Sequence, residues 1–204
     1  MKLQNVPSKI LVQEDRFFIS SDYHLSHKNI LKYDKRPFKD IHHHDETIIA
    51  NHNAVVHPTD TFIFLGDFFF GKDMNKMDEY LARLNGNKYF IKGNHDHEEH
   101  REIYKRHGLY LGEQYSRFYV GSSYKEAQMI VLNHFRMTIW DKSHHGAWHL
   151  YGHSHGGIEW LERGKCMDVG IMQNNYKPFS FSEIKTKINS KEVQILDHHT
   201  HEIS

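Results

Sequence analysis

The sequence has few of the residues that cross-link or interrupt a chain. Its 204 residues include one cysteine and four prolines. The single thiol, Cys166, can form neither an internal disulfide nor a cysteine-based zinc site, so we expect it to be a small buried side chain. No Ser/Gly-rich or single-sign charge tract divides the chain. These absences predict one compact domain over residues 1–204.

Net charge and long apolar runs are also lacking. The 26 Lys and Arg residues balance 26 Asp and Glu residues, so the charge does not indicate a nucleic-acid partner, although one stays an alternative. The longest apolar stretch, residues 62–70, is broken by Asp67, and the first residues lack the apolar segment of a signal peptide. We therefore expect a cytoplasmic protein that does not enter a membrane.

Histidine, by contrast, is abundant, with 20 residues in the chain. At this density His-x-His pairs arise by chance, so one pair is weak evidence for a metal site. The histidines at 42–44 and 198–201 follow no apolar run, and we expect them at the surface. A weak accessory metal contact is the alternative for them.

Five short apolar runs each lead into a polar residue, which is the most informative pattern in the chain. The runs cover residues 17–21, 62–65, 89–92, 129–132 and 149–151. Runs of this kind are typical of buried strands, and ligands of sheet proteins gather where strands end. If the five strands end at the same edge of one sheet, the following side chains converge: Asp22, His24, Asp67, Asn94, His134, His153 and His155. That donor set predicts a metal site with too many ligands for one ion.

Helical periodicity separates the first strands. We expect helices from Asp45, as the cap, to about residue 56, around residues 77–84 with Gly86 as the stop, and over 98–107 closed by Gly108. Further strand-like stretches cover residues 117–120, 127–132, 158–161, 166–169 and 193–196. The predicted class is mixed α/β, a two-sheet sandwich flanked by helices, with a βαβ-like first half and a more antiparallel second half.

Two divalent metals about 3.5 to 4 Å apart suit the hydrolysis of phosphate esters, because they generate a nucleophile and clamp the phosphoryl oxygens. Such a pair needs a bridging carboxylate, and Asp67 follows Gly66, which permits close backbone approach. Asp22, His24 and one C-terminal histidine can complete one metal. Asn94, His134 and a second histidine can complete the other.

These residues resemble the calcineurin-like metallophosphoesterases in order and spacing. The resemblance rests on Asp22-x-His24, Gly66-Asp67, Gly93-Asn94-His95-Asp96, His134 and Gly152-His153-x-His155, and it covers roughly residues 16–185. Segments such as Tyr33-Asp34-Lys35-Arg36-Pro37-Phe38 look similar to a small single-domain subgroup of bacteria and phages. One departure is Phe135-Arg136, where that subgroup has a Tyr-Pro-like pair.

The resemblance implies a four-layer α/β/β/α sandwich and assigns residues to each metal. Asp22, His24, Asp67 and His155 would bind the first ion, and Asp67, Asn94, His134 and His153 the second. His95 would face the phosphate and protonate the leaving oxygen, with Asp96 orienting its ring.

Three cationic or titratable side chains are candidates for holding the substrate. Arg36, His27 and Arg136 offer donors for phosphoryl oxygens, against the alternative that they only stabilise loops. Phe68, Phe69 and Phe70 are expected to cover a core or to line one wall of a pocket rather than to stack on bases.

The predicted function is a dinuclear metal-dependent hydrolase of phosphate mono- or diesters that uses a hydroxide held between the metals. The nitrogen and oxygen donors favour manganese, with iron, nickel or zinc as alternatives, over magnesium or calcium. The expected substrate is a small phosphate ester or nucleotide. The alternatives are a non-catalytic metal-binding scaffold and a nuclease or cyclic-nucleotide phosphodiesterase on the same site.

Overall fold

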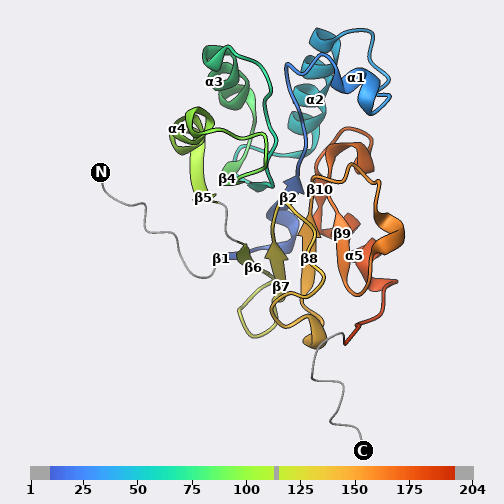
Figure 1. Cartoon of the computed structure of the whole chain (residues 1–204). Coiled ribbons are helices and arrows are strands. Elements are labelled where there is room, and N and C mark those ends of the chain that lie inside the picture. Colours follow the sequence, from blue (N-terminus) through green and yellow to red (C-terminus); the bar gives the residue numbers. More distant parts are fainter. Residues whose placement is uncertain (1–9, 113–114, 196–204) are drawn as a thin grey trace, which may run out of the picture.

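The computed structural model describes residues 10–112 and 115–195, and it has a mixed α/β fold built on two five-stranded sheets (Figure 1). The first sheet has the order β10-β2-β3-β4-β5. Its strands are β2 (Phe17–Ser20), β3 (Thr61–Phe64), β4 (Asn87–Ile91), β5 (Gly108–Gly112) and β10 (Phe179–Ser180). Strands β2 to β5 are parallel, and β10 is antiparallel to β2.

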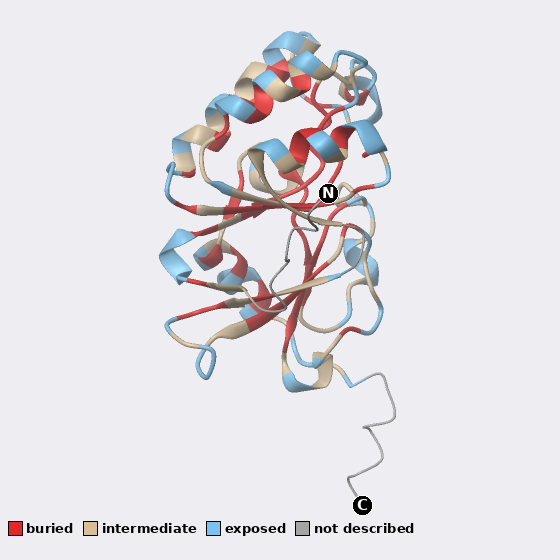
Figure 2. Cartoon of the chain, turned by 90° about the vertical axis from the view of Figure 1, so that its left-hand side faces the viewer, coloured by how far each residue is buried: buried red, intermediate tan, exposed pale blue. Residues whose placement is uncertain are grey.

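Helices connect the parallel strands of the first sheet, as parallel pairing requires. They are α1 (Ile30–Tyr33), α2 (Ile41–Val55), α3 (Met74–Arg83) and α4 (Glu98–His107). Figure 2 shows the helices as an outer layer with their buried faces turned towards the strands. One apolar cluster fills this space, and it includes Ile48 of α2, Leu81 of α3 and Tyr104 of α4 against Phe62 and Phe64 of β3.

The second sheet has the order β1-β6-β7-β8-β9. Its strands are β1 (Ile10–Val12), β6 (Ser116–Val120), β7 (Gln128–Leu132), β8 (Trp148–Tyr151) and β9 (Cys166–Asp168). Only β6 and β7 pair antiparallel, and the other three pairs are parallel. The second half of the chain is therefore less antiparallel than the sequence indicated.

A second apolar cluster fills the space between the two sheets. It joins Ile19 and Ile63 of the first sheet to Ile130 and Leu150 of the second. Helix α5 (Phe181–Asn189) packs into this cluster, because the Phe181 ring contacts both Phe17 of β2 and Trp148 of β8. The two sheets are thus held face to face, which brings the ends of their strands together.

The outer face of the second sheet is covered by irregular chain in the described residues. Trp140, Ala147 and partly buried Ile158 pack there against Val131 and Tyr151. The short 3₁₀ helices η2 (Ser143–His145) and η3 (Glu159–Leu161) belong to these covering segments. The mixed α/β class is confirmed, and α1 to α4 lie on the side of the first sheet.

Most predicted elements are present, with several corrections. The strands predicted at 17–21, 62–65, 89–92, 117–120, 129–132, 149–151 and 166–169 correspond to β2, β3, β4, β6, β7, β8 and β9. The strand predicted at 158–161 is wrong, since residues 159–161 form η3, and residues 193–195 are not a strand. Residues 196 and 198–201 lie outside the described chain.

All three predicted helices are present, and two of them begin earlier than predicted. The helix over 98–107, closed by Gly108, is confirmed as α4. Helix α2 begins earlier than predicted, because the side chain of Asp40 rather than Asp45 accepts the backbone N–H of His43 and caps it. Helix α3 is capped by Asp73 and ends before Gly86.

The burial of two side chains was predicted with different success. Cys166 is buried, as predicted, whereas His44 is buried despite the surface prediction for residues 42–44. Its ring contacts Asp45 and Arg36 inside the fold. Among the described residues, no helix is both long and apolar enough to cross a membrane.

Candidate metal centre

The candidate ligands follow strands of both sheets, not of one sheet as the sequence suggested. Asp22, Asp67 and Asn94 follow the parallel strands β2, β3 and β4, whereas His134 and His153 follow β7 and β8 of the other sheet. The sheets touch at these ends, where Ser21 forms a parallel bridge with Gly170 beyond β9. The Leu65 carbonyl accepts a 2.6 Å hydrogen bond from Nδ1 of His134 across the same junction.

The backbone is strained at most of the candidate ligands. Five of them have a left-handed backbone conformation, with φ between 48° and 67°: Asp22, His24, Asp67, His153 and His155. For a residue other than glycine, this conformation costs on the order of 1–3 kcal/mol, and it persists only where the surrounding structure enforces it. The concentration of strain at one place indicates a functional site.

Glycines allow the loops of this site to approach one another closely. A Cβ atom on Gly93 would lie 2.1 Å from Oδ1 of Asp67, and one on Gly66, where φ is +96°, would lie 2.3 Å from the nitrogen of Gly93. A Cβ atom on Gly152 would lie 2.6 Å from Oδ2 of Asp22. The Gly-Asp, Gly-Asn and Gly-His motifs are therefore needed for the carboxylates to reach their positions.

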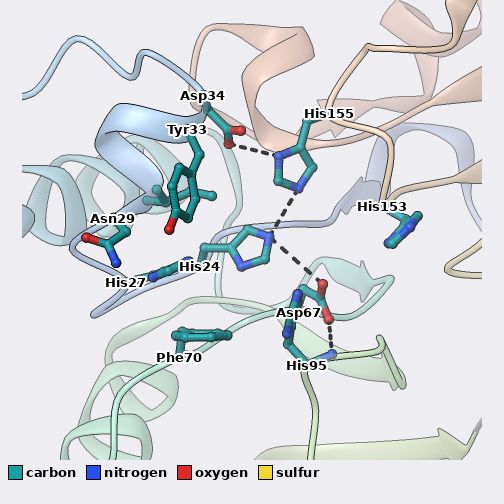
Figure 3. Close-up of a pocket in the computed structure, with 11 residues that line it drawn as sticks. His24, His27, Asn29, Tyr33, Asp34, Asp67, Phe70, His95, His153 and His155 are labelled. Atoms are coloured by element: carbon teal, nitrogen blue, oxygen red, sulfur yellow. Dashed lines mark hydrogen bonds and ion pairs between the residues drawn. The ribbon is translucent and has the colours of Figure 1, made fainter.

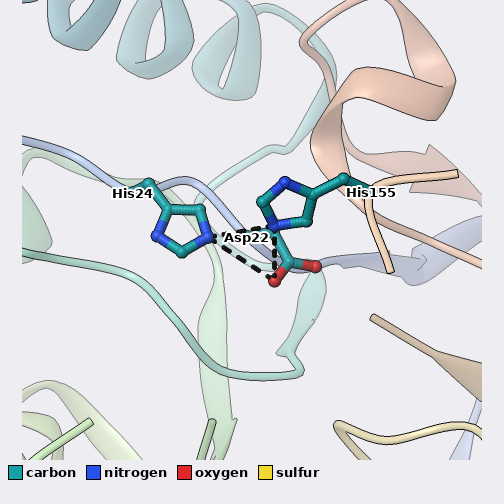
Figure 4. A group of neighbouring side chains, drawn as sticks. All are labelled: Asp22, His24 and His155. Atoms are coloured by element: carbon teal, nitrogen blue, oxygen red, sulfur yellow. Dashed lines mark hydrogen bonds and ion pairs between the residues drawn. The ribbon is translucent and has the colours of Figure 1, made fainter. Parts of the chain in front are cut away.

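Asp22, His24 and His155 form the first ligand group (Figure 4). The Nε2 atom of His155 lies 3.1 Å from Nε2 of His24 and 3.5 Å from Oδ1 of Asp22. The distance from Nε2 of His24 to Oδ1 of Asp22 is 3.8 Å. One oxygen and two ring nitrogens therefore face a common point.

Asp67, His134 and His153 form the second group, which Asn94 joins. Oδ2 of Asp67 is 3.5 Å from Nε2 of His134. The amide oxygen of Asn94 lies 2.8 Å from Nε2 of His134 and 2.8 Å from Nδ1 of His153. The structure thus brings together all seven residues that the sequence predicted as ligands.

Asp67 lies between the two groups. Its Oδ2 atom is 3.9 Å from Nε2 of His24 in the first group, besides its 3.5 Å contact with His134 in the second. Figure 3 shows His24, Asp67 and His95 side by side, with His153 and His155 on the neighbouring loop. A single carboxylate that reaches both groups is the arrangement that a dinuclear centre requires.

Outer contacts fix which nitrogen of each ring faces the site. Nδ1 of His155 is 2.8 Å from Oδ2 of Asp34, and Nδ1 of His134 bonds the Leu65 carbonyl, so both Nε2 atoms point inward. Metal-binding histidines usually have such a partner on the other nitrogen. No role was predicted for Asp34 from the sequence, where its only signal was its place in the Tyr33-Asp34 segment.

Asp168 holds the loop that carries His155. Its Oδ2 atom accepts the backbone N–H of Gly156, and its Oδ1 atom accepts that of Gly170. Burial and the nearby Asp22 raise the pKa of Asp168 to about 6.

The two acidic ligands have opposite pKa shifts. Burial and the carboxylates of Asp22 and Asp96 raise the pKa of Asp67 to about 8. Burial acts on Asp22 too, but the close ring of His155, 3.5 Å away, and the neighbouring rings of His134 and His24 bring its pKa below the usual range. Burial opposes protonation of His155, yet Asp22 and Asp34 raise the pKa of its ring to about 10.

The raised pKa of Asp67 reflects the carboxylates of Asp22 and Asp96 beside it in a buried site. Two carboxylates that face each other in a buried site repel, and a cation between them relieves the repulsion. Burial also lowers the pKa of His24 to about 3, which keeps its ring in the neutral form that binds metals.

The residues fit divalent metals. Oδ1 of Asp22 is buried and has no hydrogen-bond partner among the described residues, although it points at the two Nε2 atoms of its group. A buried carboxylate oxygen left in this way is costly unless it binds a cation. The mix of imidazole nitrogens with carboxylate and amide oxygens suits manganese, iron, nickel or zinc.

His95 and Asp96 take different positions. His95 lines the cavity beside the centre, and its backbone N–H donates to Oδ1 of Asp67. Asp96 does not orient the His95 ring as the resemblance implied. Its carboxylate is buried and accepts hydrogen bonds from the backbone of Asp67 and Gly93 and from the Tyr104 hydroxyl, so it braces the loops that carry the ligands.

The two arginines proposed for substrate binding do not line the cavity. The Arg36 side chain is 0% exposed, and its guanidinium donates to Asp34 and to the carbonyls of Asp22 and Tyr23. It is a structural brace, because a buried guanidinium with its donors in use cannot reach a substrate. Arg136 donates to the Leu161 carbonyl, away from the cavity.

An open cavity of about 460 Å³ lies over the first ligand group and Asp67. Its lining includes five histidines, which are His24, His27, His95, His153 and His155. His27 is therefore the one of the three predicted substrate contacts that the structure places at the cavity. The size is in the range of small-molecule sites in proteins, which are roughly 300–1,000 Å³.

No family model matches this chain. The uncharacterised protein MJ1445 of Methanocaldococcus jannaschii is 31% identical over 184 residues, which cover 87% of this chain and 94% of that protein. The crystal structure of AQ665, a protein of unknown function from Aquifex aeolicus, superposes with a TM-score of 0.65 at 25% identity and covers 87% of this chain and all of its own. By its identity and coverage, this chain belongs to the family of the uncharacterised protein MJ1445 from Methanocaldococcus jannaschii.

Proposed function

We propose that this protein is a phosphoesterase that depends on two divalent metal ions and has the four-layer fold of calcineurin-like metallophosphoesterases. The observation that carries the proposal is the place of Asp67 between two complete ligand groups, within 4 Å of His24 on one side and His134 on the other. A structural metal site has no need of a shared carboxylate or of an open cavity beside it.

Each group supplies enough donors for one ion. Asp22, His24 and His155 would hold the first ion and share Asp67 with the second, which Asn94, His134 and His153 would complete. A pair of bound divalent ions would act as Lewis acids towards the phosphoryl oxygens. The ions would also lower the pKa of a bound water to near neutrality.

Side chains that line the cavity would supply the hydrogen bonds and proton transfer that the metal ions do not. The hydrogen bond from the His95 backbone to Asp67 keeps the His95 ring beside the centre, where it faces the cavity. We assign this ring hydrogen-bond donation to the phosphoryl or leaving oxygen. General acid–base help of this kind contributes typically 10²–10⁴-fold to the rate.

The test is hydrolysis of p-nitrophenyl phosphate and bis-p-nitrophenyl phosphate by protein stripped of metal and reloaded with manganese. Asp67→Asn should lose activity together with bound metal, whereas His95→Ala should keep its metal and lose at least a hundredfold in kcat. Asp15→Asn and His57→Ala, at two exposed residues outside these motifs, are the matched controls.

The outcomes separate the candidate functions. Activity that survives both substitutions and chelation would overturn the mechanism. Tight binding of two manganese ions without turnover of any ester would favour the non-catalytic scaffold that the sequence left open. Hydrolysis of the diester alone would favour a phosphodiesterase.

A further inference from the structure

One side of the cavity is a group of aromatic rings, which we call the aromatic wall: Tyr33, His27 and Phe70. The His27 and Phe70 rings stack at 4.0 Å with 23° between their planes, and the Tyr33 ring meets His27 edge-on at 6.0 Å. Figure 3 shows the three rings together on one side of His24, with His153 on the opposite side of the centre. All three side chains line the cavity.

Two rings of the aromatic wall, Tyr33 and Phe70, are exposed, and His27 is half-buried, although comparable rings nearby are buried. Phe68 and Phe69 are 0% and 1% exposed, whereas Phe70 is 43% exposed and Tyr33 is 70% exposed. Backbone hydrogen bonds from Leu25 to Phe68 and from Phe70 to Leu25 fix this segment, so the outward position of Phe70 is built into the fold. Covering these rings with an apolar group would therefore remove water from a surface that is already ordered.

The charges around the cavity exclude recognition by a cationic clamp. The described residues that line it include no lysine and no arginine. Besides the ligands, the lining residues are His27, His95, Tyr33 and Phe70, with Asn29, Ile30 and the acidic Asp34. A second negatively charged group on the substrate would have no lysine or arginine partner here. A flat apolar ring, by contrast, could contact the three rings of the aromatic wall.

We propose that the aromatic wall binds a planar aromatic ring in the alcohol part of the substrate, next to the phosphate at the metal centre. This inference rests on the proposed function and narrows its substrate class to phosphate esters whose alcohol carries an aromatic ring, either a simple aryl alcohol or a nucleoside. In the hydrolysis, water attacks phosphorus and the bond from phosphorus to the alcohol oxygen breaks. The phosphate keeps the oxygen of the water, and the alcohol oxygen takes a proton.

Matched pairs of substrates test the proposal while every leaving group stays a primary alcohol. Benzyl phosphate and cyclohexylmethyl phosphate both release a primary alcohol, as do adenosine 5′-monophosphate and ribose 5-phosphate. Stacking on aromatic side chains is worth roughly 1–3 kcal/mol per base, so we expect kcat/KM to favour an aromatic member by about tenfold or more, mainly through KM. A preference in the first pair alone indicates an aryl alcohol, and one in the second pair alone indicates a nucleoside.

Binding of uncleavable analogues provides a measurement that does not need turnover. We expect benzylphosphonate to bind manganese-loaded protein about tenfold more tightly than cyclohexylmethylphosphonate in calorimetry. The ring protons of benzylphosphonate should shift upfield in NMR spectra of the complex because they lie over aromatic faces. Phe70→Leu and Tyr33→Leu should remove the preference and the shift while they leave the manganese content unchanged.

Tyr115→Leu is the control, since Tyr115 is a 45% exposed ring that does not line the cavity. Equal affinities for the two phosphonates, or a preference that survives both leucine variants, would overturn the inference. Failure of the proposed function looks different, because none of the four esters would then be hydrolysed at all, whatever the phosphonates do.

Discussion

Oδ2 of Asp34 lies 2.8 Å from Nδ1 of His155, although 121 residues separate them in the chain. This contact turns Nε2 of His155 towards Asp22. The negative charge of Asp34 also makes the ring bind a proton or a metal ion more tightly. Asp34 itself is held by two nitrogens of the Arg36 guanidinium. The loop after α1 therefore orients a candidate ligand, His155, that follows β8.

Asp34→Asn should weaken metal binding. The substitution removes the carboxylate that orients His155, and the loss of such outer partners typically lowers metal affinity 10–100-fold. Competition with a fluorescent chelator for manganese measures the affinity, and Asp15→Asn controls for the loss of a negative charge. An affinity equal to that of the wild type would show that His155 is oriented without Asp34.

Arg36→Lys should destabilise the fold rather than change substrate binding. Lysine cannot replace the bonds to Asp34, Asp22 and Tyr23 at once, and disrupting a buried ion pair costs on the order of 3–5 kcal/mol. Urea unfolding of metal-free protein measures the loss. Arg106→Lys, whose ion pair with Asp78 is on the surface, should change the stability by less than about 1 kcal/mol.

A change in KM without a change in stability for Arg36→Lys would contradict this structural role and restore Arg36 as a substrate contact.

Gly93→Ala should displace the shared carboxylate. The added methyl group would lie 2.1 Å from Oδ1 of Asp67, so the carboxylate has to move, at a cost of about 1–3 kcal/mol in stability. Metal content after reloading should fall with it. Gly112→Ala is the control for an added methyl group that meets no other atom within 4 Å, and its φ of +85° adds a backbone strain that Gly93 does not have.

Full manganese content in the Gly93→Ala variant, measured on the same reloaded samples, would contradict the placement of Asp67.

His52 should make the fold less stable in acid. Its ring is buried between the Tyr23 hydroxyl and the Asn85 carbonyl, and burial lowers its pKa to about 4 from 6.5. The stabilising contribution is complete above pH 6.5 and is lost as the pH falls towards 4, because only the unfolded state then takes up the proton. The full loss is about 3 kcal/mol.

The comparison of variants isolates this effect from other titrating groups, including His149, whose pKa is also about 4. The free energy of unfolding should fall less steeply between pH 6.5 and pH 4 for His52→Gln than for the wild type in the presence of a chelator. His57→Gln, at an exposed histidine, should follow the wild type. Parallel curves for wild type and His52→Gln would show that His52 is not neutral in the folded protein.

The strand ends could be predicted from the sequence because each one has a local signal. A short apolar run followed by Gly-Asp, Gly-Asn or Gly-His describes both the strand and the tight turn that aims the next side chain. The same local pattern does not say which strands share a sheet, and the ligands in fact follow strands of two sheets that meet face to face.

The roles of Asp96, Arg36 and Asp34 could not be predicted, because the direction of a side chain depends on packing between distant segments. Asp96 follows His95 in sequence, yet its carboxylate turns towards the backbone of Asp67. The apolar side chains of Ile158, Trp160 and Leu161 suggested a strand, but residues 159–161 form η3 with no buried residue, and only Ile158 packs against the outer face of the second sheet.

The most direct test is an X-ray structure of manganese-loaded protein with anomalous data collected at the manganese edge. We predict two anomalous peaks, one against Asp22, His24 and His155 and one against Asn94, His134 and His153, with the carboxylate of Asp67 between them. A single peak, or two peaks of which only one contacts Asp67, would contradict the shared dinuclear centre.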